Sequence, residues 1–236
     1  MKSIRIRENI PQYMKELKAW LESQEQTPPE EMSSFFTARL GGYEEHMKIW
    51  EKAYRKIGGM VPADCGELLD LGCGTGLELD EILKRCKSAR VTGIDLCGPM
   101  LEKLKEKHPQ VRAVRADYFA VPLGENRFDA AVSVESLHHF DPDRKRDLFR
   151  KIRAALKDGG RLIECDYIAC CDEEEKLLKD ESRRKREKFG IAPGVYLHLD
   201  RPLTLGHETR LMGEAGFSSV EAAGSVDGAT FLVCTK

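Results

Sequence analysis

The chain has 236 residues, and its 38 Lys and Arg nearly balance its 40 Asp and Glu, which gives a formal net charge of −2. This balance excludes a global electrostatic attraction to nucleic acid or to an anionic membrane surface, and no apolar stretch is long enough to span a bilayer. A chain of this length can bury the core of one domain, with or without a small added subdomain.

Two helical patterns come first in the chain. One covers Pro11–Gln26, where apolar side chains recur at helical spacing before a proline-rich breaker. The other covers Tyr43–Ile57, and we expect the adjacent glycines Gly58-Gly59 to end it. We therefore expect residues 1–60 to form a helical extension, or lid, on a domain that covers residues 61–236.

Strand and helix patterns then alternate. Such alternation predicts a parallel sheet covered by helices on both faces. The predicted strands are Glu67–Leu71, Arg90–Asp95, Val111–Asp117, Phe128–Val134 and Gly160–Tyr167, and the predicted helices are Leu77–Arg85, Pro99–Lys107 and Arg144–Leu156.

The last third of the chain has a different pattern. Asp172–Lys188 carries opposite charges three or four positions apart, which is typical of a solvated helix held partly by ion pairs. A helix over Thr204–Ala215 follows, with Thr204 as its cap. Strands over Ser219–Gly224 and Ala229–Thr235 complete the predicted elements.

The most informative segment is LLDLGCGTGLEL, from Leu68 to Leu79, in which a strand breaks into a turn with three glycines and then opens a helix. Such glycines allow a sharp exit from the strand and a close approach of a ligand to the backbone. Their spacing departs from the dinucleotide fingerprint, which disfavours a nicotinamide-dependent oxidoreductase. The carboxylate of Asp70 beside the turn suits a ligand that carries an ammonium group.

The turn DLGCGTG resembles the first motif of the class I S-adenosylmethionine-dependent methyltransferases, and four later segments resemble further motifs of this family in the same order. They are GIDLCGPML (93–101), ADYFAVPL (116–123), RFDAAVSVESLHHF (127–140) and LKDGGRLI (156–163). The resemblance implies an α/β fold of the Rossmann-like, doubly wound type. Its seven-stranded sheet would have the order 3-2-1-4-5-7-6, with the last strand antiparallel.

The same resemblance implies S-adenosyl-L-methionine as the cofactor and S-adenosyl-L-homocysteine as its product. In the family, the acid that ends the second strand, here Asp95, binds the ribose hydroxyls, and the acid after the third strand, here Asp117, meets the adenine amino group. Glu135, after the fourth strand, is expected to line the cofactor pocket. The other cofactor residues that the motifs imply are Asp70, Gly72, Cys73, Gly74, Gly76, Leu96, Met100 and Tyr118.

The segment SSFFTARLGGYEEHM, Ser33 to Met47, resembles an amino-terminal element of some small methyltransferases that binds the cofactor's carboxylate. Arg39 offers a forked donor pair and Tyr43 a hydroxyl for that purpose. The alternatives to cofactor binding, a surface charge for Arg39 and packing at a helix start for Tyr43, are equally open. His46, one helical turn beyond Tyr43, is a substrate candidate.

A methyl group on a sulfonium is already an activated electrophile, so the protein mainly has to align a nucleophile and exclude water. His138 is the candidate catalytic residue because a histidine can accept a proton at neutral pH, although a similar HH-apolar ending recurs across the family and can be architectural. Tyr196 and His198 lie two positions apart in an extended stretch, so they would face one substrate cavity together. An exposed edge strand is the alternative for that pair.

We thus expect S-adenosylmethionine-dependent methyl transfer to a small molecule, with the acceptor atom and the oligomeric state open. One alternative is an RNA-directed enzyme, for instance one that acts on transfer RNA through the basic segment Arg183–Arg186, and another is a cofactor-binding protein without turnover. The eight cysteines show no metal-ligand spacing, and no signal peptide is recognisable, so we expect a reduced cytoplasmic protein without a metal site and without a membrane partner.

Overall fold

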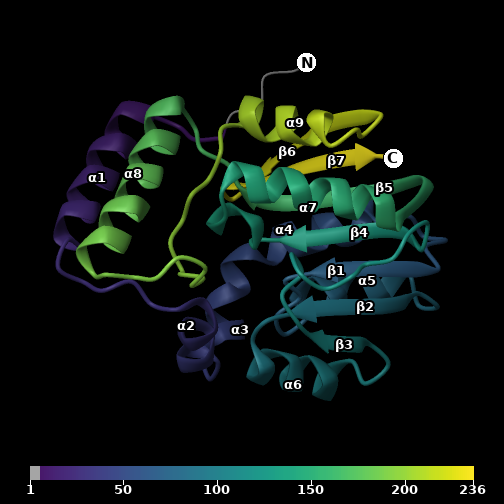
Figure 1. Cartoon of the computed structure of the whole chain (residues 1–236). Helices are drawn as coiled ribbons and strands as arrows, with labels where there is room; N and C mark the ends of the chain where they lie inside the picture. Colours follow the sequence, from purple (N-terminus) through teal and green to yellow (C-terminus); the bar gives the residue numbers. More distant parts are fainter. Residues whose placement is uncertain (1–5) are drawn as a thin grey trace.

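The computed structural model describes residues 6–236. Within this range seven strands form one sheet in the order β3-β2-β1-β4-β5-β7-β6, and β7 runs antiparallel to both of its neighbours. The predicted fold class is therefore confirmed (Figure 1). The strands are β1 (Glu67–Leu71), β2 (Arg90–Asp95), β3 (Arg112–Arg115), β4 (Phe128–Val134), β5 (Leu156–Tyr167), β6 (Ser219–Val226) and β7 (Ala229–Thr235).

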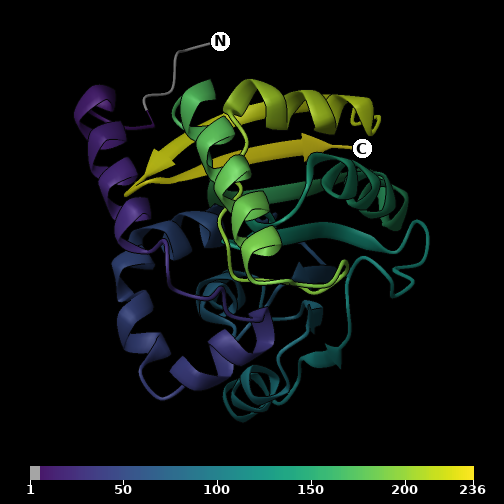
Figure 2. The same cartoon turned by 60° about the vertical axis from the view of Figure 1, so that its left-hand side comes forward.

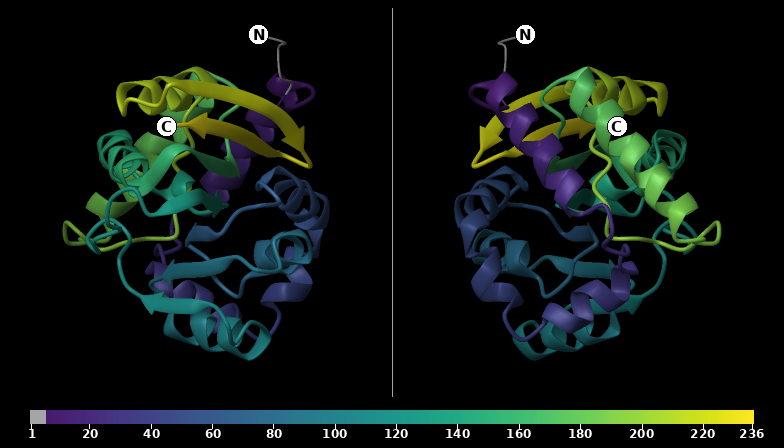
Figure 3. Two further views of the ribbon diagram at one scale, coloured as in Figure 1. Left: turned by 90° about the vertical axis from the view of Figure 1, so that its right-hand side faces the viewer. Right: turned by 90° about the vertical axis from the view of Figure 1, so that its left-hand side faces the viewer.

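Helices cover both faces of the sheet (Figure 3). On one face α4 (Glu51–Met60), α5 (Leu77–Arg85) and α6 (Gly98–Lys107) pack on a cluster that includes Leu68 and Val91. On the other face α7 (Pro142–Ala155) and α9 (Leu205–Glu214) pack on a cluster around Leu69 and Leu162. The central strands are apolar on both sides because both of their faces are buried.

A further group of helices lies beyond the carboxyl ends of the parallel strands (Figures 1 and 2). There α1 (Ile10–Ser23) lies beside α8 (Asp172–Lys188), and the buried Lys185 donates to the Gln24 and Thr27 carbonyls at 3.1 Å. This group also contains α2 (Met32–Arg39), α3 (Tyr43–His46) and the 3-10 turn η1 (Met47–Trp50), while a second 3-10 turn, η2 (Leu137–His139), follows β4. Among residues 6–236, no helix combines the length and apolarity needed to cross a membrane.

The amino-terminal third departs most from the sequence prediction. Helix α2 was not predicted, because it shows no apolar stripe; the Glu31 carboxylate starts it by accepting the N–H groups of Ser33 and Ser34 at 3.0 and 2.8 Å. The predicted single helix Tyr43–Ile57 is instead the succession of α3, η1 and α4.

The prediction that Gly58-Gly59 ends a helix is wrong, since α4 continues through both glycines to Met60. A Cβ atom on Gly58 would lie 2.9 Å from the Cβ atom of Glu81. Gly58 is therefore the point at which α4 approaches α5 closely, and its lack of a side chain is a packing requirement. Elsewhere the differences concern element ends: β3 is shorter than predicted, and β5 already begins at Leu156.

Candidate active site

The turn after β1 carries the first part of the site. Gly72 and Gly74 have φ values of +75° and +48°, which glycine adopts without strain. A Cβ atom on Gly72 would lie 2.2 Å from the Ser136 hydroxyl, whereas the position in front of Gly74 is open, with only the Tyr43 hydroxyl at 3.9 Å. The backbone at Gly74 can therefore be approached closely by a ligand.

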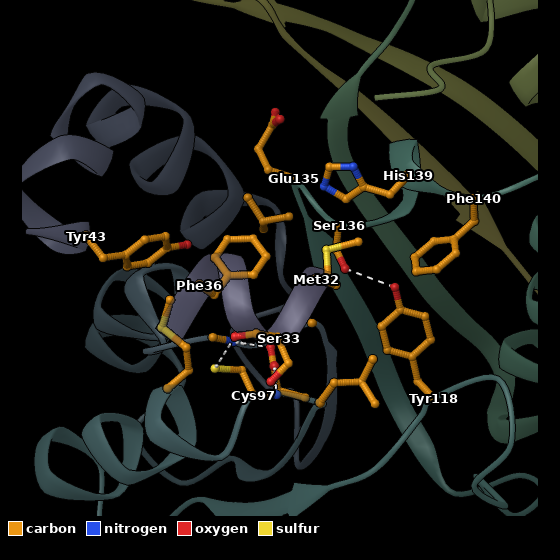
Figure 4. Close-up of a pocket in the computed structure, with 16 residues that line it drawn as sticks. Met32, Ser33, Phe36, Tyr43, Cys97, Tyr118, Glu135, Ser136, His139 and Phe140 are labelled. Carbon is orange, nitrogen blue, oxygen red and sulfur yellow. Dashed lines mark hydrogen bonds between the residues drawn. The ribbon is translucent and has the colours of Figure 1, made fainter. Parts of the chain in front are cut away.

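A first cavity lies between this turn, the end of β2 and helix α2 (Figure 4). Figure 4 shows Phe36 and Tyr43 on one side of it and Tyr118 on the opposite side. Eight of the residues that the sequence assigns to the cofactor line this cavity: Tyr43, Gly72, Gly74, Asp95, Leu96, Met100, Tyr118 and Glu135.

Asp95 provides the polar edge of the first cavity. One carboxylate oxygen accepts the N–H of Gly74 at 2.9 Å and the other accepts the N–H of Cys97 at 2.8 Å. Burial raises the pKa of Asp95, while these backbone bonds hold the carboxylate in place. Each carboxylate oxygen can accept a second hydrogen bond, so the arrangement fits a pair of ribose hydroxyls.

The remainder of the first cavity is mostly apolar. Leu96, Met100 and Phe140 line it beside Tyr118, whose hydroxyl bonds to the Ser136 hydroxyl at 3.1 Å. An apolar slot next to a backbone turn and a fixed carboxylate fits an adenosine group. The residues present are therefore compatible with S-adenosylmethionine.

Three other predicted cofactor residues lie beneath the turn and do not line the first cavity. Asp70 is fully buried and faces Glu78, and burial raises its pKa well above the usual value. The Cys73 side chain packs under the turn near Gly93. Gly76 occupies the cap position of α5 with φ +77°. These residues shape the turn from below, where Asp70 and Cys73 are buried.

Asp117 and Arg39 are also absent from the first cavity, because each already has a partner. Asp117 accepts the N–H of Phe119 at 2.8 Å with one oxygen and the Tyr196 hydroxyl at 2.7 Å with the other. The guanidinium of Arg39 forms a forked pair with Glu30, at 2.7 and 3.0 Å. In this arrangement neither side chain points at a cofactor.

A second, wider cavity opens next to the first. Aromatic side chains contribute much of its wall, together with several histidines and acids. It shares four residues with the first cavity, which we call the shared wall: Phe36, Tyr43, Glu135 and His139. A molecule in the second cavity can therefore reach a group bound in the first.

Glu135 stands in the shared wall with an unusual backbone. Its φ of +47° is rare for a residue other than glycine, and its Oε1 atom is buried without a hydrogen-bond partner in the described part of the chain. Burial, with the nearby charge of Asp166, raises the pKa of Glu135 to about 8.

A cluster of histidines and acids lies beside Glu135 in the second cavity. The Nδ1 atom of His138 is hydrogen bonded to Asp166, and its Nε2 atom lies 3.5 Å from Oδ1 of Asp200. Burial would lower the pKa of His138, but Asp166 and Asp200 together raise it well above the usual value. The predicted catalytic histidine thus has acids at both ring nitrogens, which does not match a neutral base.

The neighbouring His139 behaves differently. Its Nδ1 atom lies 3.5 Å from the same Asp200 oxygen and 3.2 Å from the Leu199 carbonyl oxygen. Burial, together with the charge of His138, lowers the pKa of His139 to about 3. Asp166 and Asp200 were not among the predicted site residues. The sequence signal for them was weak: Asp166 is the next-to-last residue of the fifth strand, and Asp200 follows His198 by two positions.

The three predicted substrate residues separate in the structure. His46 and His198 line the second cavity, where the ring of His198 stacks on Phe35 with centroids 3.5 Å apart. Tyr196 does not line it, because its hydroxyl bonds to Asp117 and accepts from Arg144. The prediction that Tyr196 and His198 face one cavity together is therefore wrong.

The basic segment Arg183–Arg186 is engaged within the protein. Arg183 pairs with Asp180 at 3.0 Å, and Arg184 pairs with Glu181 at 2.8 Å and with Glu25. The side chains of Lys185 and Arg186 donate to backbone carbonyl groups. Arg184, Lys185 and Arg186 thus tie α8 to neighbouring segments, whereas the Arg183 pair lies within α8 and leaves that side chain 70% exposed.

The sheet order, the glycine turn and the acid at the end of β2 together define a Rossmann-like methyltransferase fold. Residues 68–160 match the sequence profile of a family described as a methyltransferase domain. The chain therefore carries a domain of the class I S-adenosylmethionine-dependent methyltransferases, and S-adenosyl-L-methionine is the cofactor of that domain.

Two similar sequences and one similar solved structure support this assignment. The chain is 31% identical over 160 residues to the O-methyltransferase cnsE of Penicillium expansum, covering 59% of this chain and 56% of that protein. It is 29% identical over 189 residues to the O-methyltransferase resE of Aspergillus sclerotiorum, covering 75% and 65%. It thus spans less than two thirds of the length of these relatives. Human N-acetylserotonin methyltransferase, solved with S-adenosylmethionine, has a similar fold, with a TM-score of 0.59 at 18% identity over 82% of this chain and 53% of that one.

Proposed function

We propose that the protein transfers the methyl group of S-adenosylmethionine to a hydroxyl group of a small aromatic molecule. The shared wall is the observation that carries the proposal, because Phe36, Tyr43, Glu135 and His139 border both cavities. The cofactor would occupy the first cavity and the acceptor the second. In the reaction the S–CH3 bond breaks, an O–CH3 bond forms, and the hydroxyl proton leaves.

The lining of the second cavity supports an aromatic acceptor. Phe35, Trp50 and Tyr167 contribute rings to its wall, and flat rings bind well against such side chains. The names of the two fungal relatives support oxygen as the acceptor atom. We assign the binding of the hydroxyl and the uptake of its proton to the acidic and histidine side chains around His138.

We further infer that the helical extension, of which the structure describes residues 6–60, acts as a lid on the domain formed by residues 61–236. Met32, Ser33 and Phe36 of α2 line the first cavity, while Trp50 lines the second. With a ligand in place, these side chains would exclude water from the transferring methyl group.

Binding and turnover test the two parts of this proposal separately. We expect S-adenosylhomocysteine to bind with a micromolar Kd in isothermal titration calorimetry. Asp95→Ala should weaken this binding about 10- to 100-fold, because it removes charged acceptors of two hydroxyl hydrogen bonds. Glu102→Gln, at an exposed position on α6, is the matched control and should bind like the wild type.

Turnover would be followed by mass spectrometry with a panel of phenols, hydroxynaphthalenes and aliphatic alcohols, and with transfer RNA. We expect methylated products from aromatic hydroxyl compounds. If binding of S-adenosylhomocysteine is absent or unaffected by Asp95→Ala, the assigned cofactor site is wrong. Exclusive methylation of transfer RNA would instead overturn the small-molecule acceptor.

A further inference from the structure

Three potential metal ligands converge from two distant segments. His138 and His139 belong to η2, and Asp200 belongs to the segment that leads to α9. The two segments are joined by a hydrogen bond of 2.6 Å from the Arg201 N–H to the His138 carbonyl. One ligand atom from each of His138, His139 and Asp200 lies within 4.8 Å of the other two.

The orientation of His138 is fixed from behind by Asp166. One Asp166 oxygen bonds to the His138 Nδ1 atom and accepts the Tyr167 N–H at 2.8 Å. The other accepts the N–H groups of Leu137 and His138, at 2.8 and 3.1 Å. A histidine that ligates a metal through one nitrogen commonly donates its other N–H to a carboxylate. Asp166 supplies that contact and turns Nε2 towards Asp200.

The distances suit coordination by a small ion. The Asp200 Oδ1 atom lies 3.5 Å from both His138 Nε2 and His139 Nδ1. Ligands bound to zinc at about 2.1 Å in a tetrahedron are roughly 3.4 Å apart, so small movements would suffice. His139 would exchange its 3.2 Å contact with the Leu199 carbonyl for the ion.

The exposure of the three side chains and their ligand chemistry both favour a transition-metal ion. The histidine side chains are only 8% and 4% exposed, whereas that of Asp200 is 42% exposed, and all three border the second cavity. Two imidazoles and one carboxylate favour zinc or iron over magnesium and calcium, which prefer oxygen ligands. Glu135 and Asp166 also approach His138, at its Nδ1 atom, but Asp166 already saturates that nitrogen.

We propose that His138, His139 and Asp200 bind one divalent transition-metal ion, of which zinc is the expected example, with its remaining coordination position open to the second cavity. Asp166 is the positioning residue of this site. Insofar as the proposed function holds, an acceptor hydroxyl bound to the ion would lose its proton more easily, since a divalent cation stabilises the oxyanion.

Metal binding alone tests the site, without cofactor or acceptor. Tag-free, full-length protein is stripped with a chelator and titrated with Co²⁺, and Zn²⁺ is then added as a competitor. We expect one Co²⁺ per chain with visible absorption bands from nitrogen and oxygen ligands, which Zn²⁺ abolishes. Asp200→Asn should weaken Co²⁺ binding at least about tenfold, and Asp166→Asn about 10- to 100-fold.

His108→Gln is the control for adventitious histidine binding, because His108 lines neither cavity and bonds to Asp80 at 2.7 Å. It should bind Co²⁺ like the wild type. Asp200→Asn keeps the half-exposed side chain nearly the same size, so it should fold, and circular dichroism would verify this. The proposal is overturned if stoichiometric binding is absent, or if Asp200→Asn binds Co²⁺ as tightly as the wild type.

Failure of the metal site and failure of the proposed function give different results. If the protein transfers methyl groups but binds no Co²⁺, the proposed metal site is wrong and the proposed function stands. If Co²⁺ binding depends on Asp200 but the protein methylates none of the acceptors, the metal site is supported and the proposed reaction is wrong.

Discussion

Glu135 combines two unfavourable features in one residue of the shared wall. Its φ of +47° costs about 1 kcal/mol for a side chain with a Cβ atom. Its buried Oε1 atom has no hydrogen-bond partner in the range 6–236, which adds a desolvation cost. Its other oxygen, Oε2, lies 3.9 Å from His138 Nδ1, too far for a hydrogen bond. Such strain is typical of positions that are kept for a ligand.

Glu135→Gly should therefore stabilise the protein and impair its activity. We expect a gain of about 1 kcal/mol in the free energy of unfolding, since glycine adopts the positive φ freely and no carboxyl group remains buried. Turnover should fall at least about tenfold if the carboxyl group aligns the acceptor. Urea denaturation and product formation measure the two effects.

Asn126→Gly is the control for Glu135→Gly, because Asn126 has a similar φ of +48° but lies in the turn before β4, outside both cavities. It should leave turnover unchanged. Full turnover by Glu135→Gly would contradict a role for the carboxyl group, and a lower stability would contradict the strain.

At the scale of elements, helix α2 is tied to the segment that leads to α9. The Met32 N–H donates to the Tyr196 carbonyl at 2.9 Å, and the His198 N–H donates to the Glu30 carbonyl at 3.0 Å. Phe35 of α2 stacks on His198. Helix α2 thus lines both cavities, while the segment to which it is tied contributes His198 and Asp200 to the second cavity. A ligand in the first cavity would affect the order of the second.

Hydrogen exchange can detect closure of this lid. With saturating S-adenosylhomocysteine, we expect the amides of α2 to exchange at least about tenfold more slowly, because Met32, Ser33 and Phe36 would contact the ligand. Helix α1 belongs to the same extension but lines neither cavity, so its amides serve as the internal reference. Protection of the glycine turn without any protection of α2 would show that residues 1–60 are not a lid.

The contact between α4 and α5 depends on one glycine. Gly58→Ala should lower the free energy of unfolding by about 1–3 kcal/mol, because the added Cβ atom would lie 2.9 Å from the Glu81 Cβ atom and 3.0 Å from its backbone carbon. Gly213→Ala in α9 is the matched control, since that position is exposed and has nothing within 4 Å. It should gain about 0.5–1 kcal/mol. A similar effect of both substitutions in thermal unfolding would contradict the packing argument.

Across the whole molecule, the sequence predicts local structure better than pairings between distant segments. Apolar strands and glycine turns are encoded by adjacent residues, so these elements could be predicted from local patterns, whereas the sheet order and the role of Asp95 followed from the resemblance to a known family. The Asp117–Tyr196 bond joins residues 79 positions apart, and the Asp200 contact with His138 joins η2 to the segment before α9. No local pattern announces such contacts, because they depend on how the elements pack. The absence of metal-ligand spacing among the cysteines likewise says nothing about ligands that meet only in the fold.

The pH dependence of global stability follows from the buried acids beneath the glycine turn. Glu78 on α5 faces Asp70 on β1, with Lys107 of α6, Asp80 and Tyr43 nearby, and burial raises the pKa of Glu78 from 4.5 to about 7. At pH values between these two pKa values, Glu78 is therefore protonated in the folded protein but ionised in the unfolded chain. The contribution of Glu78 to stability is complete below about pH 4.5 and is lost as pH rises towards 7, by about 2–3 kcal/mol.

Glu78→Gln should flatten this part of the stability curve. The amide cannot ionise, and it can donate a hydrogen bond to Asp70, which favours the charged form of that neighbour. Urea denaturation at pH 5 and pH 8 should thus show a larger loss for the wild type than for Glu78→Gln. The exposed Glu102→Gln serves as the control and should follow the wild type, because all other titrating groups are common to both. Equal losses in all three proteins would mean that Glu78 is ionised in the fold, and that the pair under the glycine turn does not share a proton.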